Sequence, residues 1–68
     1  MVKLTWRDVD EIARDLARRY PETDPLNVEL PQLRAMIVGL PVFGDEPDAG
    51  TDEILEAIQE AWYDEHEG

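Results

Sequence analysis

The chain has 68 residues, of which 43% are hydrophobic and 34% are charged, and it carries a formal net charge of -11. A chain of this length forms one domain, here expected to span residues 1–68, and its hydrophobic core is small. Because the sequence contains no cysteine, it excludes disulfide bonds, thiolate metal ligands and a cysteine nucleophile, and the core must come from the packing of helices.

The charges are distributed unevenly along the chain. All six basic residues lie within residues 1–34 together with seven of the 17 acids, and the other ten acids lie within residues 35–68. This asymmetry predicts a partner with a basic surface, or bound cations, and argues against nucleic acid and anionic membranes as ligands. With neither a secretory signal nor the ~20 apolar residues that span a bilayer, we expect a cytoplasmic location. The strong like charge favours a monomer.

The first helix is predicted to start after Thr5, a favoured N-cap, and to end at Tyr20, because Pro21 disfavours helical geometry in the residue before it. Its apolar side chains recur at three-and-four spacing: Trp6, Val9, Ile12, Ala13, Leu16, Ala17 and Tyr20. Two acid–arginine pairs at i,i+4 spacing are expected on the opposite face: Asp10/Arg14 and Asp15/Arg19.

A second, shorter helix is predicted to start at Pro31, which suits a first helical turn, and to stop at Gly39–Pro41. Before it, residues 21–25 have the composition of a turn. Residues 27–30 alternate polar and apolar side chains, which permits at most a very short strand or an extended connector.

The third helix is predicted to follow an irregular loop over residues 41–51 and to start after Thr51, its N-cap. Val42 and Phe43 are expected to anchor this loop to the core, while its acids lie in water. Apolar side chains of the third helix also recur at helical spacing: Ile54, Leu55, Ile58, Ala61 and Trp62. The sequence therefore predicts a mainly α-helical fold, a compact three-helix domain with at most very short strands.

Five carboxylates of the third helix fall within one stripe, roughly 80° wide at about 100° per residue, nearly opposite its apolar face. They are Glu53, Glu56, Glu60, Asp64 and Glu67. Like charges at three-and-four spacing cost about 0.2 to 0.5 kcal/mol a pair, and acids near the end of a helix also oppose its dipole. A sequence shaped for stability alone would place lysines here, so we interpret the stripe as an interaction surface. The alternative is a solvated face that only aids solubility.

The sequence shows no catalytic constellation, since it lacks cysteine, serine, a Gly-rich phosphate loop and a second histidine. We therefore predict that the chain is not an enzyme. His66 is interpreted as a solvated residue, and both Trp6 and Trp62 as core residues. Tyr63 lies on the flank of the third helix, where it is expected to be exposed enough to join an interface.

The chain also carries a series of short segments in a defined order: Leu4-Thr5-Trp6-x-Asp8, Glu11-Ile12-Ala13, Tyr20-Pro21, Asp24-Pro25, Val28, Phe43-x-Asp45-x-Pro47, Ile54-Leu55-Glu56-Ala57-Ile58, Trp62 and Asp64-Glu65. This ordered set resembles the IscX family along nearly the whole chain. The resemblance implies a modified winged-helix-like topology and a role in iron-sulfur cluster assembly. It also implies binding to the cysteine desulfurase and weak binding of iron through surface carboxylates, with no tightly bound cofactor.

Two groups of acids are the candidate site residues. The candidates for partner binding are Glu53, Glu56, Glu60, Asp64, Glu65 and Glu67. Four of these follow from the resemblance, and Glu60 and Glu67 are added from the geometry of the stripe. The candidates for weak iron binding are Asp45, Glu46, Asp48, Glu56 and Glu60. Gly44 stands where related members often carry another acid, which predicts a reduced affinity of the loop for cations.

Three functions remain open at this point. The first, which we favour, is an acidic adaptor or regulator that binds a basic surface of a cysteine desulfurase, with an iron-sulfur scaffold protein and a ferredoxin as further candidate partners. A second is an iron carrier or donor for cluster assembly, whose carboxylates would bind iron weakly and with little selectivity. The third is a DNA mimic or transcriptional accessory built on the winged-helix-like scaffold.

Overall fold

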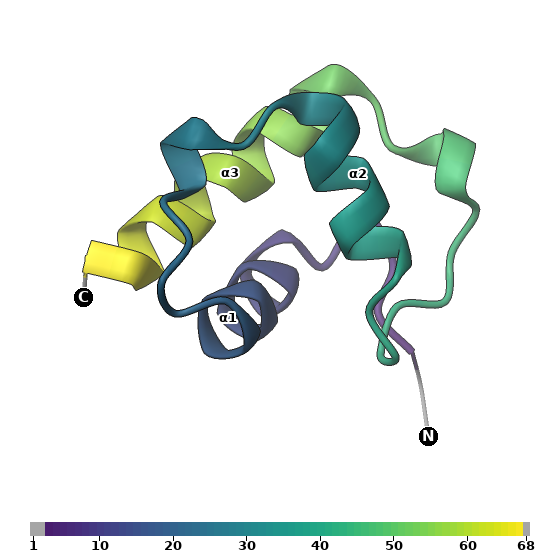
Figure 1. The fold of residues 1–68 in the computed structure, drawn as a ribbon. Helices are drawn as coiled ribbons and strands as arrows, with labels where there is room; N and C mark the ends of the chain where they lie inside the picture. The colour runs from purple at the N-terminus through teal and green to yellow at the C-terminus, as the bar shows by residue number, and fades with distance from the viewer. Residues whose placement is uncertain (1–2, 68) are drawn as a thin grey trace.

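The computed structural model describes residues 3–67, which form three α-helices and two short 3-10 helices (Figure 1). They are α1 (Val9–Arg19), η1 (Pro25–Asn27), α2 (Leu30–Val38), η2 (Pro47–Ala49) and α3 (Asp52–Glu67). The predicted mainly helical fold with three helices is confirmed, and its winged-helix-like topology stays a prediction. Within residues 3–67, every helix is too short or too polar to cross a membrane.

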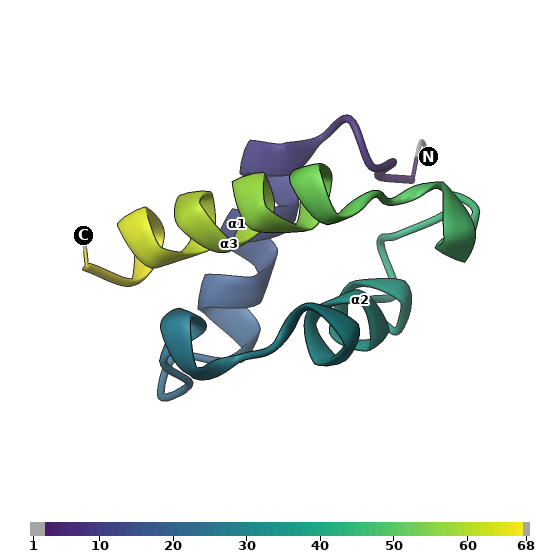
Figure 2. The ribbon, with the colours of Figure 1, turned by 90° about the horizontal axis from the view of Figure 1, so that it is seen from above.

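The core lies among the three helices, whose arrangement Figures 1 and 2 show from two directions. Helices α1 and α3 make the most extensive contact between any two elements, and α2 packs against α3. The buried hydrophobic side chains are Trp6, Ile12, Ala13, Leu16, Val28, Leu33, Ile37, Leu40, Phe43, Leu55, Ile58 and Trp62. The predicted apolar face of each helix therefore supplies the core, and both tryptophans belong to it as expected.

Helix α1 begins about one turn later than the sequence predicts, so the prediction of Thr5 as its N-cap is wrong. The N-cap is Asp8, whose amide donates to the carbonyl of Thr5 (3.0 Å) and whose Oδ2 accepts from the amide of Thr5 (2.9 Å). Trp6 leaves the helix because its indole N–H donates to the carbonyl of Glu46 (2.6 Å) and its ring packs edge-on against Phe43. A contact with residues about forty positions away thus outweighs a local cap.

The other helix boundaries lie close to their predicted places. Helix α1 ends at Arg19, before the Tyr20–Pro21 step. Helix α2 carries Pro31 in its first turn and ends before Gly39. Thr51 caps α3, since its Oγ1 accepts from the amide of Ile54 (3.3 Å). Local chemistry at these positions is sufficient to fix where each helix starts or stops.

Residues 27–30 form no strand in the structure, where the sequence permits a very short one. The carboxylate of Asp24 accepts from the amide of Leu26 (3.0 Å) and starts η1, after which the backbone is extended at Val28. Across residues 3–67, β-pairing is limited to an isolated parallel bridge between Leu4 and Phe43. This bridge joins the beginning of the chain to the loop before α3.

The loop between α2 and α3 is tied to the rest of the domain. A guanidinium nitrogen of Arg34 donates to the carbonyl of Pro47 (2.7 Å), and Phe43 is buried and Val42 half-buried, as predicted. Gly50 permits a close approach to the indole ring of Trp6, because a Cβ at this position would lie 2.7 Å from a ring carbon. The path of the loop is therefore set by contacts with α2 and with the segment before α1.

Candidate partner-binding surface

The acidic stripe runs along the outer face of α3. All five of its carboxylate side chains are exposed: Glu53, Glu56, Glu60, Asp64 and Glu67. The opposite face of the helix is anchored in the core by Leu55, Ile58 and Trp62, each at most 1% exposed. Burial of these three side chains fixes the rotation of α3 about its axis, so the stripe necessarily faces solvent, as the sequence predicts.

A polar anchor that the sequence did not reveal also holds α3 in place. Gln59 donates from Nε2 to the carbonyls of both Pro25 (2.7 Å) and Val28 (2.9 Å). These two bonds connect α3 to η1 across more than thirty residues of sequence. The available signal in the sequence was a glutamine at the edge of the apolar face of the helix, but its partners could not be identified without the fold.

The carboxylates of the acidic stripe have no ion-pair partner within residues 3–67. The ion pairs in this part of the chain are Arg14–Glu65, Arg18–Asp15 and Arg19–Asp15. Helix α3 itself contributes seven acids and neither lysine nor arginine. The repulsion along the stripe, about 0.2 to 0.5 kcal/mol for each like-charge pair, is therefore not offset by charge pairing within the described domain.

Glu65 lies apart from the acidic stripe. Its Oε2 is 3.9 Å from Nε of Arg14, so its side chain is directed toward α1. Both side chains are well exposed, which makes the pair worth little to stability. Because Arg14 is directed to α3 in this way, the predicted pair with Asp10 is not among the ion pairs of residues 3–67. The structure thus separates Glu65 from the other five candidate partner-binding residues.

The loop acids are not gathered into one site with the helix acids. The prediction that the loop acids lie in water is wrong for Asp45, which is half-buried. Its carboxylate accepts from the amides of Trp6 (3.3 Å) and Glu46 (2.7 Å), so it connects the loop to the segment before α1. Glu46 and Asp48 are exposed. Among residues 3–67, no three His, Cys, Asp or Glu side chains lie close enough together to hold a metal ion. The five candidate iron ligands therefore do not form a preassembled site.

Comparison with known proteins assigns the domain to a family. Residues 4–67 match the family described as iron-sulphur cluster assembly. The chain belongs to this family. It is the IscX family that the sequence resembles, so that prediction is confirmed. A similar relative is an uncharacterized protein of Pseudomonas aeruginosa, which is 44% identical over 66 residues that cover 97% of this chain and 100% of the relative.

In this IscX-family domain, Asp15 is the one charged side chain among residues 3–67 that is buried. Its carboxylate accepts from Nε of Arg19 (2.8 Å) and is also paired with Arg18, which confirms the predicted Asp15/Arg19 pair. The prediction that this pair lies on the face opposite the core is wrong for Asp15, which is buried. Burial on its own would raise the pKa of Asp15, but the hydrogen bonds and charges of the two arginines outweigh burial and hold this pKa below its usual value. Asp15 thus has a structural role.

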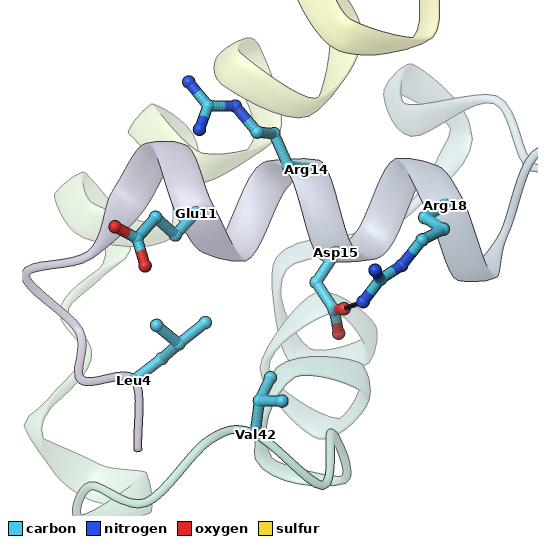
Figure 3. Close-up of a pocket in the computed structure, with 6 residues that line it drawn as sticks. All are labelled: Leu4, Glu11, Arg14, Asp15, Arg18 and Val42. Atoms are coloured by element: carbon cyan, nitrogen blue, oxygen red, sulfur yellow. Dashed lines mark hydrogen bonds and ion pairs between the residues drawn. The ribbon is translucent and has the colours of Figure 1, made fainter. Parts of the chain in front are cut away.

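The IscX-family domain also has a shallow groove of about 420 Å³ beside α1 (Figure 3). The groove is lined by Leu4, Glu11, Arg14, Asp15, Arg18 and Val42. Figure 3 shows Arg18 reaching Asp15 at one wall, while Arg14 extends away from Leu4 and Val42. No residue of the acidic stripe lines this groove. Since Asp15 is already neutralised by arginines, the acidic stripe remains the main concentration of charge and the candidate binding surface.

Proposed function

We propose that this chain is a protein-binding regulator of iron-sulfur cluster assembly, and that it docks its acidic stripe on a basic surface of a cysteine desulfurase. Membership of the IscX family supports a role in iron-sulfur cluster assembly. The observation that carries the proposal is the set of five exposed carboxylates on α3, none with an ion-pair partner within residues 3–67. A surface with this much unpaired charge is suited to a partner of opposite charge.

Charge complementarity explains how such a surface would work. The acidic stripe attracts a basic groove over roughly a Debye length, which raises the rate of encounter and orients α3 along the groove. Once docked, a domain of 7.8 kDa covers the groove and limits the access of other proteins to it. Regulation by occupancy needs no catalytic group, so we propose no enzymatic activity for this chain.

Reversal of charge within the acidic stripe tests the proposal. The double variant Glu56→Lys/Glu60→Lys changes two exposed side chains at the middle of the stripe and leaves the core untouched. Like charges facing each other across an interface cost several kcal/mol, so we expect affinity for a purified cysteine desulfurase to fall by at least about tenfold. Isothermal titration calorimetry at low ionic strength measures this affinity, and wild-type binding should weaken steeply as salt is added.

The matched control is Glu22→Lys/Glu29→Lys, which makes the same change of net charge at two exposed acids outside α3. We expect this control to retain most of the wild-type affinity. Equal losses in the two double variants would show that only the net charge matters, and the acidic stripe would lose its assigned role. Binding of the wild-type chain to a scaffold protein or a ferredoxin, but not to the desulfurase, would show that the assigned partner is wrong.

Weak iron binding is the second candidate function, because Glu56 and Glu60 lie one helical turn apart and both are exposed. Carboxylate oxygens are hard ligands that accept iron, but two of them without histidine or cysteine give little selectivity. An iron carrier needs a more complete ligand set than this pair. The absence of any three-residue ligand cluster within residues 3–67 therefore favours the regulator over the carrier.

A further inference from the structure

Leu26 stands out from the other large hydrophobic side chains. It is 60% exposed, and within residues 3–67 every other large hydrophobic side chain is buried or half-buried. It occupies the middle of η1, a turn position where polar residues are usually favoured. A single exposed leucine is common on protein surfaces and has no meaning by itself. Leu26 is distinguished by the hydrogen bonds that hold its backbone and by its position next to α3.

The backbone around Leu26 is held on both sides. Its own amide donates to the carboxylate of Asp24 (3.0 Å), and the ring of the preceding Pro25 is buried. Nε2 of Gln59 also donates hydrogen bonds to the carbonyls of Pro25 (2.7 Å) and Val28 (2.9 Å), one before and one after Leu26. Because the backbone of this turn is already held, burial of Leu26 by a partner requires no ordering of the turn and costs only the rotamer freedom of the side chain.

The contact of η1 with α3 places the backbone of Leu26 on the flank of α3 that borders the acidic stripe. Gln59, which binds η1, follows Glu56 by three residues and immediately precedes Glu60, so it lies on the flank of α3 next to the stripe. Half-buried Tyr63 lies one turn further along the same flank. Contacts between η1 and α3 are present in the structure, and Figure 1 shows η1 next to α3. Leu26 and Tyr63 therefore supply apolar surface next to the acidic stripe on this flank of α3.

We propose that Leu26 is the apolar anchor of the partner-binding surface and enters an apolar pocket that borders the basic groove of the partner. This inference rests on the proposed function. Charged groups lose hydration when they are buried, so an interface of carboxylates gains encounter rate and orientation more than affinity. An apolar side chain gains affinity from its removal from water, and that gain does not depend on salt. The acidic stripe and Leu26 thus supply two different parts of recognition.

The test separates these two parts by their dependence on salt. Affinities for the purified desulfurase are measured at several ionic strengths for wild type, Leu26→Ser and Glu56→Lys/Glu60→Lys. Loss of a leucine that becomes fully buried corresponds to a decrease in affinity on the order of 10- to 100-fold. We expect Leu26→Ser to show this decrease equally at every salt concentration, with the slope of log Kd against log salt unchanged. The stripe variant should instead show a shallower slope.

Leu26→Met is the matched control, because it keeps an apolar side chain of similar volume and should retain affinity within a few-fold of wild type. Leu26→Gln provides a second polar variant, and thermal melts confirm that each variant is folded. Wild-type affinity in both polar variants would overturn the anchor and leave the proposed function intact. A changed salt slope in Leu26→Ser would also overturn it. Absence of desulfurase binding by the wild-type chain, or normal binding by the stripe variant, would overturn the proposed function itself.

Discussion

Helices α1 and α3 are similarly rich in charge but use it in opposite ways. Helix α1 interleaves three acids with three arginines, whereas α3 carries seven acids and no lysine or arginine. In α1 the buried Asp15 is neutralised by Arg18 and Arg19, so its charge helps to hold the fold. In α3 the exposed carboxylates repel one another and remain available to a partner. The paired charges of α1 therefore stabilise the domain, whereas the unpaired carboxylates of α3 lower its stability.

Removal of the paired charge in α1 should have the largest effect on stability. Asp15→Asn leaves Arg18 and Arg19 without their negative partner at a position that is only 6% exposed. The two arginine side chains are 73% and 39% exposed, so water compensates them in part. We expect the free energy of unfolding to fall by about 1 to 2 kcal/mol at neutral pH. Urea unfolding followed by circular dichroism measures this loss.

The pH dependence of the same variant identifies the cause. In the folded chain the pKa of Asp15 lies below its ordinary value of about 3.8, so the unfolded state binds more protons between the two values. The stabilisation by the ionised Asp15 is fully present at a pH above the ordinary pKa, and it is lost as the pH falls through the lower pKa of the folded state. The difference in unfolding free energy between wild type and Asp15→Asn should therefore become smaller as the pH falls. The control is Asp10→Asn, at an exposed site of α1, which should lower the unfolding free energy by about 0.5 kcal/mol or less. A difference between wild type and Asp15→Asn that does not change with pH would contradict the ion-pair explanation.

Reversal of charge in α3 should have a smaller effect, and of opposite sign. Glu56→Lys/Glu60→Lys converts several repulsive neighbours at three-and-four spacing into attractive ones, so we expect the unfolding free energy to rise by about 1 kcal/mol. For a domain of this size, that corresponds to a rise in Tm of about 4 to 8 °C. Differential scanning calorimetry measures it. An equal rise in Glu22→Lys/Glu29→Lys would mean that net charge, not the stripe, is responsible.

Divalent cations should have the smallest effect. They screen the repulsion between Asp48, Glu56, Glu60 and their neighbours, so we expect a gain of a few tenths of a kcal/mol that is nearly equal for ferrous iron and calcium. Thermal melts in equal concentrations of the two ions, kept anaerobic, make the comparison. A stoichiometric preference for iron over both calcium and manganese, lost in Glu56→Gln/Glu60→Gln, would favour the iron carrier.

The sequence was sufficient to predict the three helices and the exposed acidic stripe, because both follow from local periodicity. Thr51 and Pro21 act on their immediate neighbours, so the helix ends that they define were also predictable. The start of α1 was not, since it depends on an indole hydrogen bond from Trp6 to Glu46 across forty residues. Interactions of this kind have no signature in the residues next to the helix.

The candidate site also contains residues that local geometry predicts and residues whose roles depend on distant contacts. The stripe follows from helical geometry alone, and that geometry already places Glu65 about a third of a turn or more away from it. Glu65 entered the candidate set through the family resemblance, and the structure shows it directed to Arg14. The roles of Asp45 and Gln59 depend on backbone groups of distant segments, so no local pattern revealed them.

The extensive contact between α1 and α3 also bears on how the chain is made. Helix α1 ends at Arg19 and α3 begins only at Asp52, so α1 is synthesised well before its main packing partner. Until then Ile12 and Leu16 have no counterpart for burial, and an isolated helix of this length is marginal in water. The core therefore cannot form until α3 has been synthesised and has left the ribosome, so folding completes in a late step that joins distant segments.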